Sequence, residues 1–144
     1  MRTAEGLGVN KIYLTGYTPY PITNNDPRLP HISVKLTAAI QKTALNAQDT
    51  LNWEYEEDVF SVISRLKSDG YTLCALEQTA AAISLNTYKV PDKCAMLLGS
   101  EVTGVDHELL ELCPVHLYIP MFGKKESFNV VQATAMALYH LRFS

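Results

Sequence analysis

The chain has 144 residues, of which 47% are hydrophobic, and its formal net charge is −3. This length and apolar content predict a single domain, residues 1–144, with one sizeable core. No apolar segment approaches the roughly 20 residues that cross a bilayer, and the polar start lacks a secretory leader, so we expect a cytoplasmic protein. Because the net charge is negative, any nucleic acid would have to be bound by a local basic patch.

Apolar runs alternate along the chain with segments whose apolar positions repeat at the helical period. The runs lie at residues 11–15, 71–77, 94–99 and 116–119. Runs of this length are typical of strands buried on both faces, and strands that alternate with helices favour parallel pairing. The sequence therefore predicts an α/β fold with a mostly parallel sheet flanked by helices.

A loop and a helix are predicted after the first apolar run. Residues 18–30 contain four prolines and the sequence Asn24-Asn25-Asp26, which are typical of a loop. The next segment, residues 33–44, has the apolar spacing of a helix. We expect its inward face to carry Ile32, Leu36, Ala39 and Ile40.

The clearest helical pattern covers residues 58–69 and stops at Gly70. Its apolar positions follow the i, i+3, i+4, i+7 spacing, at Val59, Val62, Ile63 and Leu66. Four carboxylates lie just before this pattern or at its start, at Glu54, Glu56, Glu57 and Asp58. Because negative charge is favourable near a helix N-terminus, we interpret this charged run as structural rather than catalytic.

The last predicted helix, residues 130–141, has too few polar positions to form a solvent-facing side. Such a helix is buried on most sides. A terminal helix of one small domain can be covered in this way only if its outer side packs onto something else. We expect a homodimer in which this helix lies at the interface.

The cysteines and histidines do not predict a metal site. Cys74, Cys94 and Cys113 are odd in number and widely separated, which favours buried reduced thiols over a disulfide framework or a zinc site. The four histidines also lack the short spacing that would bring two imidazoles onto one metal. They lie at His31, His107, His116 and His140.

Two glycine-bearing turns follow the last two apolar runs. The first is Leu97-Leu98-Gly99-Ser100-Glu101-Val102-Thr103-Gly104, and the second begins Ile119-Pro120-Met121-Phe122-Gly123 and continues Lys124-Lys125-Glu126-Ser127-Phe128-Asn129-Val130. Loops that follow buried parallel strands are where open α/β sheets bind ligands. Ser127 or Asn129 is also suited to cap the final helix, and a helix N-terminus presents free N–H groups to a polar ligand.

These two segments resemble the second and third motifs of the SpoU/TrmH family of RNA 2′-O-ribose methyltransferases, within the SPOUT superfamily. The segment Arg2-Thr3-Ala4-Glu5-Gly6 is similar to the latter half of the family's first motif. In the family this motif begins further upstream, with a strand and Asn-x-Gly. We therefore expect the chain to be a SpoU-type domain without that first strand.

The resemblance implies a fold with a deep C-terminal trefoil knot, and S-adenosylmethionine bound among the knotted loops. Composition and periodicity do not predict a knot, because knotted chains are rare. The residues that match the family's cofactor pocket are Leu98, Gly99, Ser100, Gly104, Ile119, Met121, Ser127 and Phe128.

The implied reaction is methyl transfer to a ribose 2′-hydroxyl of tRNA or rRNA. Arg2 matches the family's catalytic arginine, which acts either as a base or, in keeping with its high pKa, as a phosphate clamp that stabilises the developing alkoxide. Glu101, Asn129 and Ser127 match polar residues that position the substrate and catalytic groups. The expected RNA contacts are Arg2, Lys124 and Lys125. The alternative is a non-catalytic or truncated knotted homodimer that binds cofactor or RNA without turnover.

Overall fold

The computed structural model describes all residues, 1–144. The chain forms two compact units, Met1–Val62 and Ile63–Ser144. Each unit contains its own parallel sheet. None of the helices combines the length and apolar content required to span a bilayer. The expectation of parallel strands flanked by helices is therefore confirmed within each unit.

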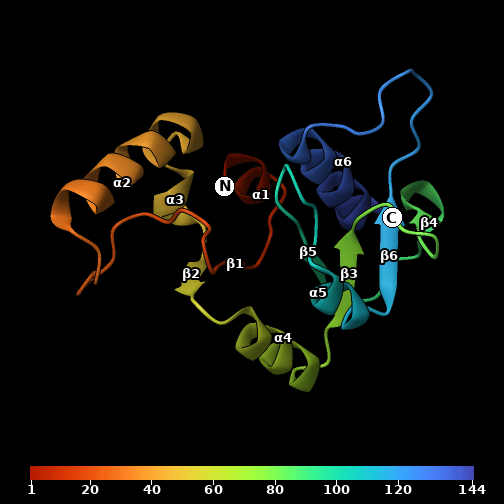
Figure 1. Cartoon of the computed structure of the whole chain (residues 1–144), viewed down its shortest axis with the longest axis horizontal. Coiled ribbons are helices and arrows are strands. Elements are labelled where there is room, and N and C mark those ends of the chain that lie inside the picture. Colours follow the sequence, from red (N-terminus) through yellow and green to blue (C-terminus); the bar gives the residue numbers. More distant parts are fainter. The chain divides into compact units, whose positions relative to one another are not determined.

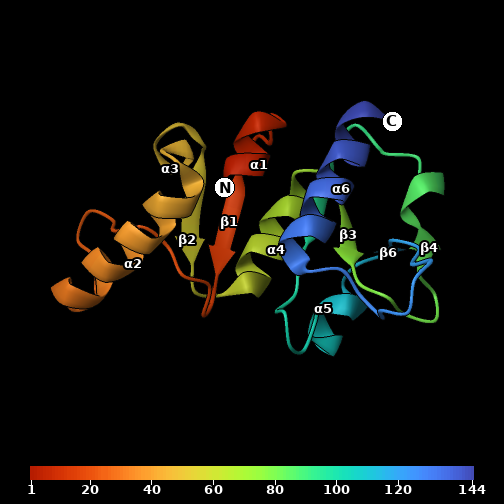
Figure 2. The same cartoon turned by 90° about the horizontal axis from the view of Figure 1, so that it is seen from above.

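The first unit is built around two strands that run parallel to each other (Figure 2). In their register Ile12 lies opposite Trp53. The predicted strand and helix of this region are both present, and the helix begins at Pro30, a residue well suited to the first helical position. The elements are α1 (Arg2–Gly6), β1 (Ile12–Thr15), α2 (Pro30–Ala44), α3 (Ala47–Thr50) and β2 (Trp53–Glu56).

The acidic run around residue 56 has two structural roles, not one. Glu54 and Glu56 lie in β2, and Glu54 Oε2 accepts a hydrogen bond from Lys11 Nζ at 2.6 Å. Asp58 Oδ1 accepts the N–H of Phe60 at 3.0 Å, at the start of α4 (Val59–Ser68). The helix-dipole interpretation therefore fits Asp58, whereas for Glu54 and Glu56 it was wrong, because these residues form a strand.

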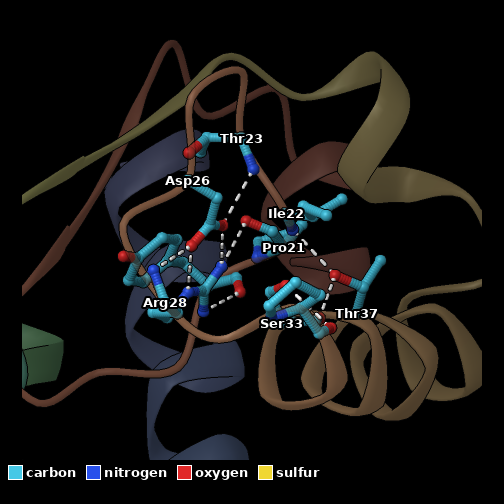
Figure 3. Close-up of polar contacts among 9 residues, drawn as sticks. Pro21, Ile22, Thr23, Asp26, Arg28, Ser33 and Thr37 are labelled. Atoms are coloured by element: carbon cyan, nitrogen blue, oxygen red, sulfur yellow. Dashed lines mark hydrogen bonds and ion pairs between the residues drawn. The ribbon is translucent and has the colours of Figure 1, made fainter.

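The buried face of α2 differs from the predicted face. Ile32 is 41% exposed and Ala39 is also exposed, whereas Ser33 is 1% exposed. The reason is that the loop at residues 18–30 lies against the polar side of the helix (Figure 3). The N–H of Ile22 donates to Thr37 Oγ1 at 2.7 Å, and that hydroxyl donates to the carbonyl of Ser33 at 2.7 Å.

The second unit contains a four-stranded parallel sheet in the order β4-β6-β3-β5. All three strands predicted for this region are present with bounds within two residues of the expected ones. The elements that follow α4 are β3 (Thr72–Leu76), β4 (Ile83–Ser84), the 3-10 helix η1 (Leu85–Thr87), β5 (Cys94–Leu97), α5 (His107–Glu111), β6 (Val115–Tyr118) and α6 (Val130–Phe143).

The core of the second unit lies between this sheet and α6 (Figure 1). Leu73, Cys74 and Ala75 of β3 are all 1% exposed or less, although successive side chains point to opposite faces. The strand is therefore buried on both faces, which explains its continuous apolar sequence. On the helix side, Cys74, Leu117 and Ala137 belong to one buried cluster.

The three cysteines are free thiols, and Cys74 and Cys113 are buried, as predicted. Cys74 Sγ lies 3.5 Å from Cys94 Sγ, which is half-buried on the neighbouring strand. The hydrogen bond to Cys94 and burial raise the pKa of the Cys74 thiol. Burial also raises the pKa of Cys113, so both groups remain protonated at neutral pH.

One side of α6 packs into the core, while the other is uncovered in the single chain. Ala137 is fully buried, whereas Val131, Tyr139 and Phe143 are 64%, 61% and 66% exposed. The expectation that a helix of this composition is buried on most sides is thus met on its core side only.

We predict that Leu117→Ala lowers the free energy of unfolding by about 2–5 kcal/mol, because it leaves a cavity at a fully buried position. Urea unfolding followed by circular dichroism measures the change. Val34→Ala removes a side chain that is 59% exposed on α2 and should stay within about 0.5 kcal/mol of wild type. If the two substitutions changed the free energy of unfolding equally, the assignment of Leu117 to the core would be wrong.

Candidate functional site

A cleft of about 570 Å³ opens in the second unit where β3, β5 and β6 end. The three strands are parallel, so their carboxyl ends and the loops that follow them meet at one edge of the sheet. The lining comes from residues 76–78 after β3, 98–104 after β5, and 117–119, 121, 126–130 and 133 from β6 to α6. Both glycine-bearing turns therefore contribute to a single site.

The first turn is a tight loop that depends on two glycines. A Cβ atom on Gly99 would overlap the backbone of Gly104 and Val105, so no larger residue fits without movement. Ser100 and Gly104 exchange two backbone hydrogen bonds, at 3.0 and 3.1 Å. Gly104 has a φ of +70°, in the region that favours glycine. The two glycines thus allow the loop to close tightly on itself at the cleft.

Glu77 holds this loop from the neighbouring strand. Its Oε2 accepts the N–H of Val105 at 2.9 Å, and its Oε1 accepts the N–H of Gln78 at 3.2 Å. A Cβ on Gly104 would collide with the same carboxylate. Sequence analysis missed Glu77 as a site residue, although an acidic residue at the end of a buried strand was a usable signal.

Asn129 connects the second turn to the first. Its Oδ1 accepts the N–H of Val131 at 2.9 Å, so Asn129, and not Ser127, caps α6. Its Nδ2 donates to Glu101 Oε1 at 3.3 Å. These two bonds determine which way the amide points and hold Glu101 beside the start of the helix.

The structure brings together most of the residues predicted from sequence. Every predicted cofactor residue lines the cleft, as do the predicted catalytic residues Glu101, Ser127 and Asn129. Lys124 and Lys125 are exposed in the β6–α6 loop and do not belong to the lining. Arg2 is exposed on α1 of the first unit. The lining residues that were not predicted include Leu76, Glu77, Gln78, Tyr118 and Ala133.

The lining combines apolar walls with negative charge. Three carboxylates line the cleft, Glu77, Glu101 and Glu126, and no lysine or arginine does so. This charge distribution opposes a ligand that carries phosphate groups. It suits a ligand with apolar and hydrogen-bonding parts and a positive charge.

Comparisons with known proteins place this geometry in context. A family model described as the SpoU rRNA Methylase family matches residues 1–139. A tRNA (guanosine(18)-2′-O)-methyltransferase of Borreliella burgdorferi is 32% identical over 97 residues, which are 67% of this chain and 44% of that protein. A 23S rRNA (guanosine(2553)-2′-O)-methyltransferase of Bacillus subtilis is 36% identical over 84 residues, 57% of this chain and 33% of that protein.

Among solved structures, an AdoMet-bound rRNA methyltransferase from Sinorhizobium meliloti matches 98% of this chain with a TM-score of 0.76. The identity is 22%, so this likeness concerns the fold. The match covers 48% of that chain. This chain thus spans less than half the length of each of these three proteins.

We predict that Gly99→Ala destabilises the loop by about 1–3 kcal/mol, because the added methyl group must displace backbone atoms. Amide hydrogen exchange measured by NMR should show faster exchange of the Val105 N–H, which Glu77 binds in the wild type. Gly123→Ala is the matched control, because its Cβ would meet no atom within 4 Å. Unchanged exchange in Gly99→Ala would argue against the described close approach.

Proposed function

Because the chain belongs to the SpoU rRNA methylase family, we propose that it transfers a methyl group from S-adenosylmethionine to a ribose 2′-hydroxyl of tRNA or rRNA. The observation that carries this proposal is the single cleft formed by the two loops that match the family's second and third motifs. The names of the relatives, which act on guanosine in tRNA and in rRNA, support the RNA substrate.

The cleft fits the proposed cofactor in size and in charge. Its volume of about 570 Å³ lies in the range of small-molecule sites. The cofactor carries a sulfonium and no phosphate, which agrees with a lining of three carboxylates without lysine or arginine. Backbone groups of the loop at residues 98–104 would bind the polar edge of the adenine, with apolar walls from Leu98, Ile119, Met121 and Phe128.

Bound there, the cofactor would supply an electrophilic methyl group, and the chain's residues would orient the acceptor hydroxyl. Glu101 is held by Asn129 at the cleft and is suited to accept a hydrogen bond from a ribose hydroxyl. Asn129 keeps a fixed orientation because its oxygen caps α6. Ser127 lines the same cleft and offers a further hydroxyl for positioning.

We propose that the positive charge needed to bind the phosphates of the RNA comes from residues outside the lining of the cleft. Arg2 would bind a phosphate and stabilise the developing alkoxide, since a guanidinium stays protonated and presents several donors. Lys124 and Lys125 are exposed on the β6–α6 loop and suit phosphate contacts next to the cleft.

We also propose that the two units act as one methyltransferase domain and that the protein works in the cytoplasm. A further part of the proposal is a trefoil knot at the C-terminal end. The knot is proposed because the chain belongs to the SpoU family, whose resemblance implies it. At this end of the chain α6 packs beside η1, and His140 Nε2 is hydrogen-bonded to the carbonyl of Tyr88 at 2.9 Å.

The proposal also includes a homodimer through α6. Val131, Tyr139 and Phe143 give this helix an exposed apolar surface in the single chain. Exposed apolar residues that cluster on one element mark interaction sites more often than scattered ones do. A second copy of the same helix would bury these side chains symmetrically.

We predict that the purified chain binds S-adenosylhomocysteine, measured by isothermal titration calorimetry. Gly99→Ala should weaken this binding at least about tenfold, because the loop that lines the cleft must shift. Gly123→Ala should bind like the wild type. The absence of binding by the wild-type chain would remove the basis of the proposed function.

Methyl transfer is predicted to depend on Arg2. Incorporation of labelled methyl groups into bulk tRNA or rRNA should fall about 100-fold or more in Arg2→Ala, as expected when a group that stabilises transition-state charge is removed. Binding of S-adenosylhomocysteine should stay unchanged in this variant. If the wild type binds the cofactor analogue but transfers no methyl group to either RNA, the non-catalytic module is the better description.

The dimer is predicted to have about twice the 16.0 kDa mass of the chain in light scattering coupled to size-exclusion chromatography. Tyr139→Glu places a charge on the exposed face of α6 and should give a monomer. Val34→Glu is the control, because Val34 is similarly exposed, at 59%, on α2. A wild-type mass of one chain would contradict the proposed dimer.

A further inference from the structure

A second cleft, of about 380 Å³, lies in the first unit and has no part in the cofactor site. It opens where β1 and β2 end, because Gly16 directly follows β1 and Glu57 directly follows β2. The two strands are parallel, so these ends meet at one edge, the place where such sheets bind ligands. Aromatic rings and one guanidinium contribute to its walls, from Tyr17, Tyr20, Tyr55 and Arg28.

Three of these planar groups form a stack. The rings of Tyr20 and Tyr55 are stacked with their centroids 3.8 Å apart. The Arg28 guanidinium carbon lies 3.5 Å from the centroid of Tyr20. Both neighbours approach Tyr20 so closely that they must cover opposite faces of its ring. The outer faces of Tyr55 and Arg28 therefore end the stack.

Arg28, at one end of the stack, is hydrogen-bonded within the proline-rich loop (Figure 3). Arg28 donates to both carboxylate oxygens of Asp26, at 2.8 and 2.5 Å, and to the carbonyls of Tyr20 and Pro21, at 2.9 and 3.2 Å. These hydrogen bonds from Arg28 hold the pKa of the Asp26 carboxyl well below its ordinary value. The ion pair therefore persists at any physiological pH.

The hydrogen bonds leave Arg28 little capacity to bind phosphate. At least three of its five N–H groups already have partners within the loop. The Arg28 side chain is also only 16% exposed, so its role is to hold the ring of Tyr20 in place. Exposed aromatic rings are groups on which unpaired RNA bases stack. Tyr17 adds a ring that is 81% exposed at the same cleft.

Glu57 supplies the cleft with a carboxylate that can bind hydrogen-bond donors of a ligand. It is exposed at the end of β2, and an ionised carboxylate only accepts hydrogen bonds. Guanine is the base that presents two adjacent donors, N1–H and N2–H, on its Watson–Crick edge. A carboxylate can accept from both at once, whereas adenine, cytosine and uracil each present one donor group there.

We propose that this cleft binds an unpaired guanine base of the substrate RNA, stacked on Tyr17 and recognised by Glu57. The inference rests on the proposed function only in taking the ligand to be RNA. Gly16 favours this arrangement, because its φ of +56° turns the chain directly before Tyr17 and its carbonyl accepts the Tyr55 hydroxyl at 2.8 Å. The site is thus built before the ligand arrives.

The first test is an NMR titration of the full-length chain with GMP and, separately, AMP. We expect GMP to shift the backbone amide signals of residues 16–18, 20, 28 and 57, with a lower dissociation constant than AMP. Glu57→Gln should weaken GMP binding several-fold and abolish the preference over AMP. Glu56→Gln is the matched control, because this neighbouring carboxylate lies in β2 outside the lining.

The second test uses a fluorescently labelled single-stranded RNA with one guanine in a uridine-rich sequence. Tyr17→Ala should weaken its binding by about fivefold or more, since a stacking ring is lost. Tyr17→Phe keeps the ring and should bind like the wild type. Amide spectra of all variants check that the fold is retained.

The inference is overturned if GMP and AMP shift the same signals with equal affinity, if the shifts occur outside the first-unit cleft, or if Glu57→Gln behaves like Glu56→Gln. It stands or falls independently of methyl transfer. A chain that binds GMP as described but not S-adenosylhomocysteine would contradict the proposed function alone, and the reverse result would contradict the guanine site alone.

Discussion

The candidate site depends on the contact between the backbones of Gly99 and Gly104, secured by Glu77. Because neither glycine carries a Cβ, the loop can close on itself at the edge of the cleft. The Glu77 carboxylate then ties Val105 to the end of β3, so that the loop after β5 is attached to the strand beside it. Without this attachment, the walls from β3, β5 and α6 would not share one cavity.

Polar side chains in both units hold irregular segments that the hydrophobic core cannot position. In the second unit Glu77 and Asn129 restrain the two turns, and in the first unit Asp26 and Arg28 restrain the proline-rich loop. Each restraint starts from a regular element or lies beside one. The proposed binding surfaces are therefore formed by loops that hydrogen bonds hold in the absence of a ligand, and such preorganisation lowers the entropic cost of binding.

The parts of the fold that were predictable are those in which burial alone determines the residue pattern. β3 is covered on both faces and therefore reads as an unbroken apolar run. β2 was missed because its glutamates alternate with Trp53 and Tyr55, and the acidic residues favoured another explanation. The inward face of α2 was missed because the burial of Ser33 depends on a loop that covers it. Within the site, the motif residues were predictable. The position of Glu77 at the end of a buried strand was a usable signal, but its hydrogen bond to Val105 was not predictable because the two residues lie 28 positions apart.

The side-chain amide of Asn129 makes two hydrogen bonds that serve different purposes. Its oxygen begins α6 and its nitrogen meets Glu101. An aspartate at this position would retain the cap but repel Glu101. A serine would also retain the cap, but its side chain is too short to reach Glu101. The stability of the helix start and the orientation of Glu101 therefore depend on the same side chain. Asparagine meets both demands, although it lies on an exposed loop.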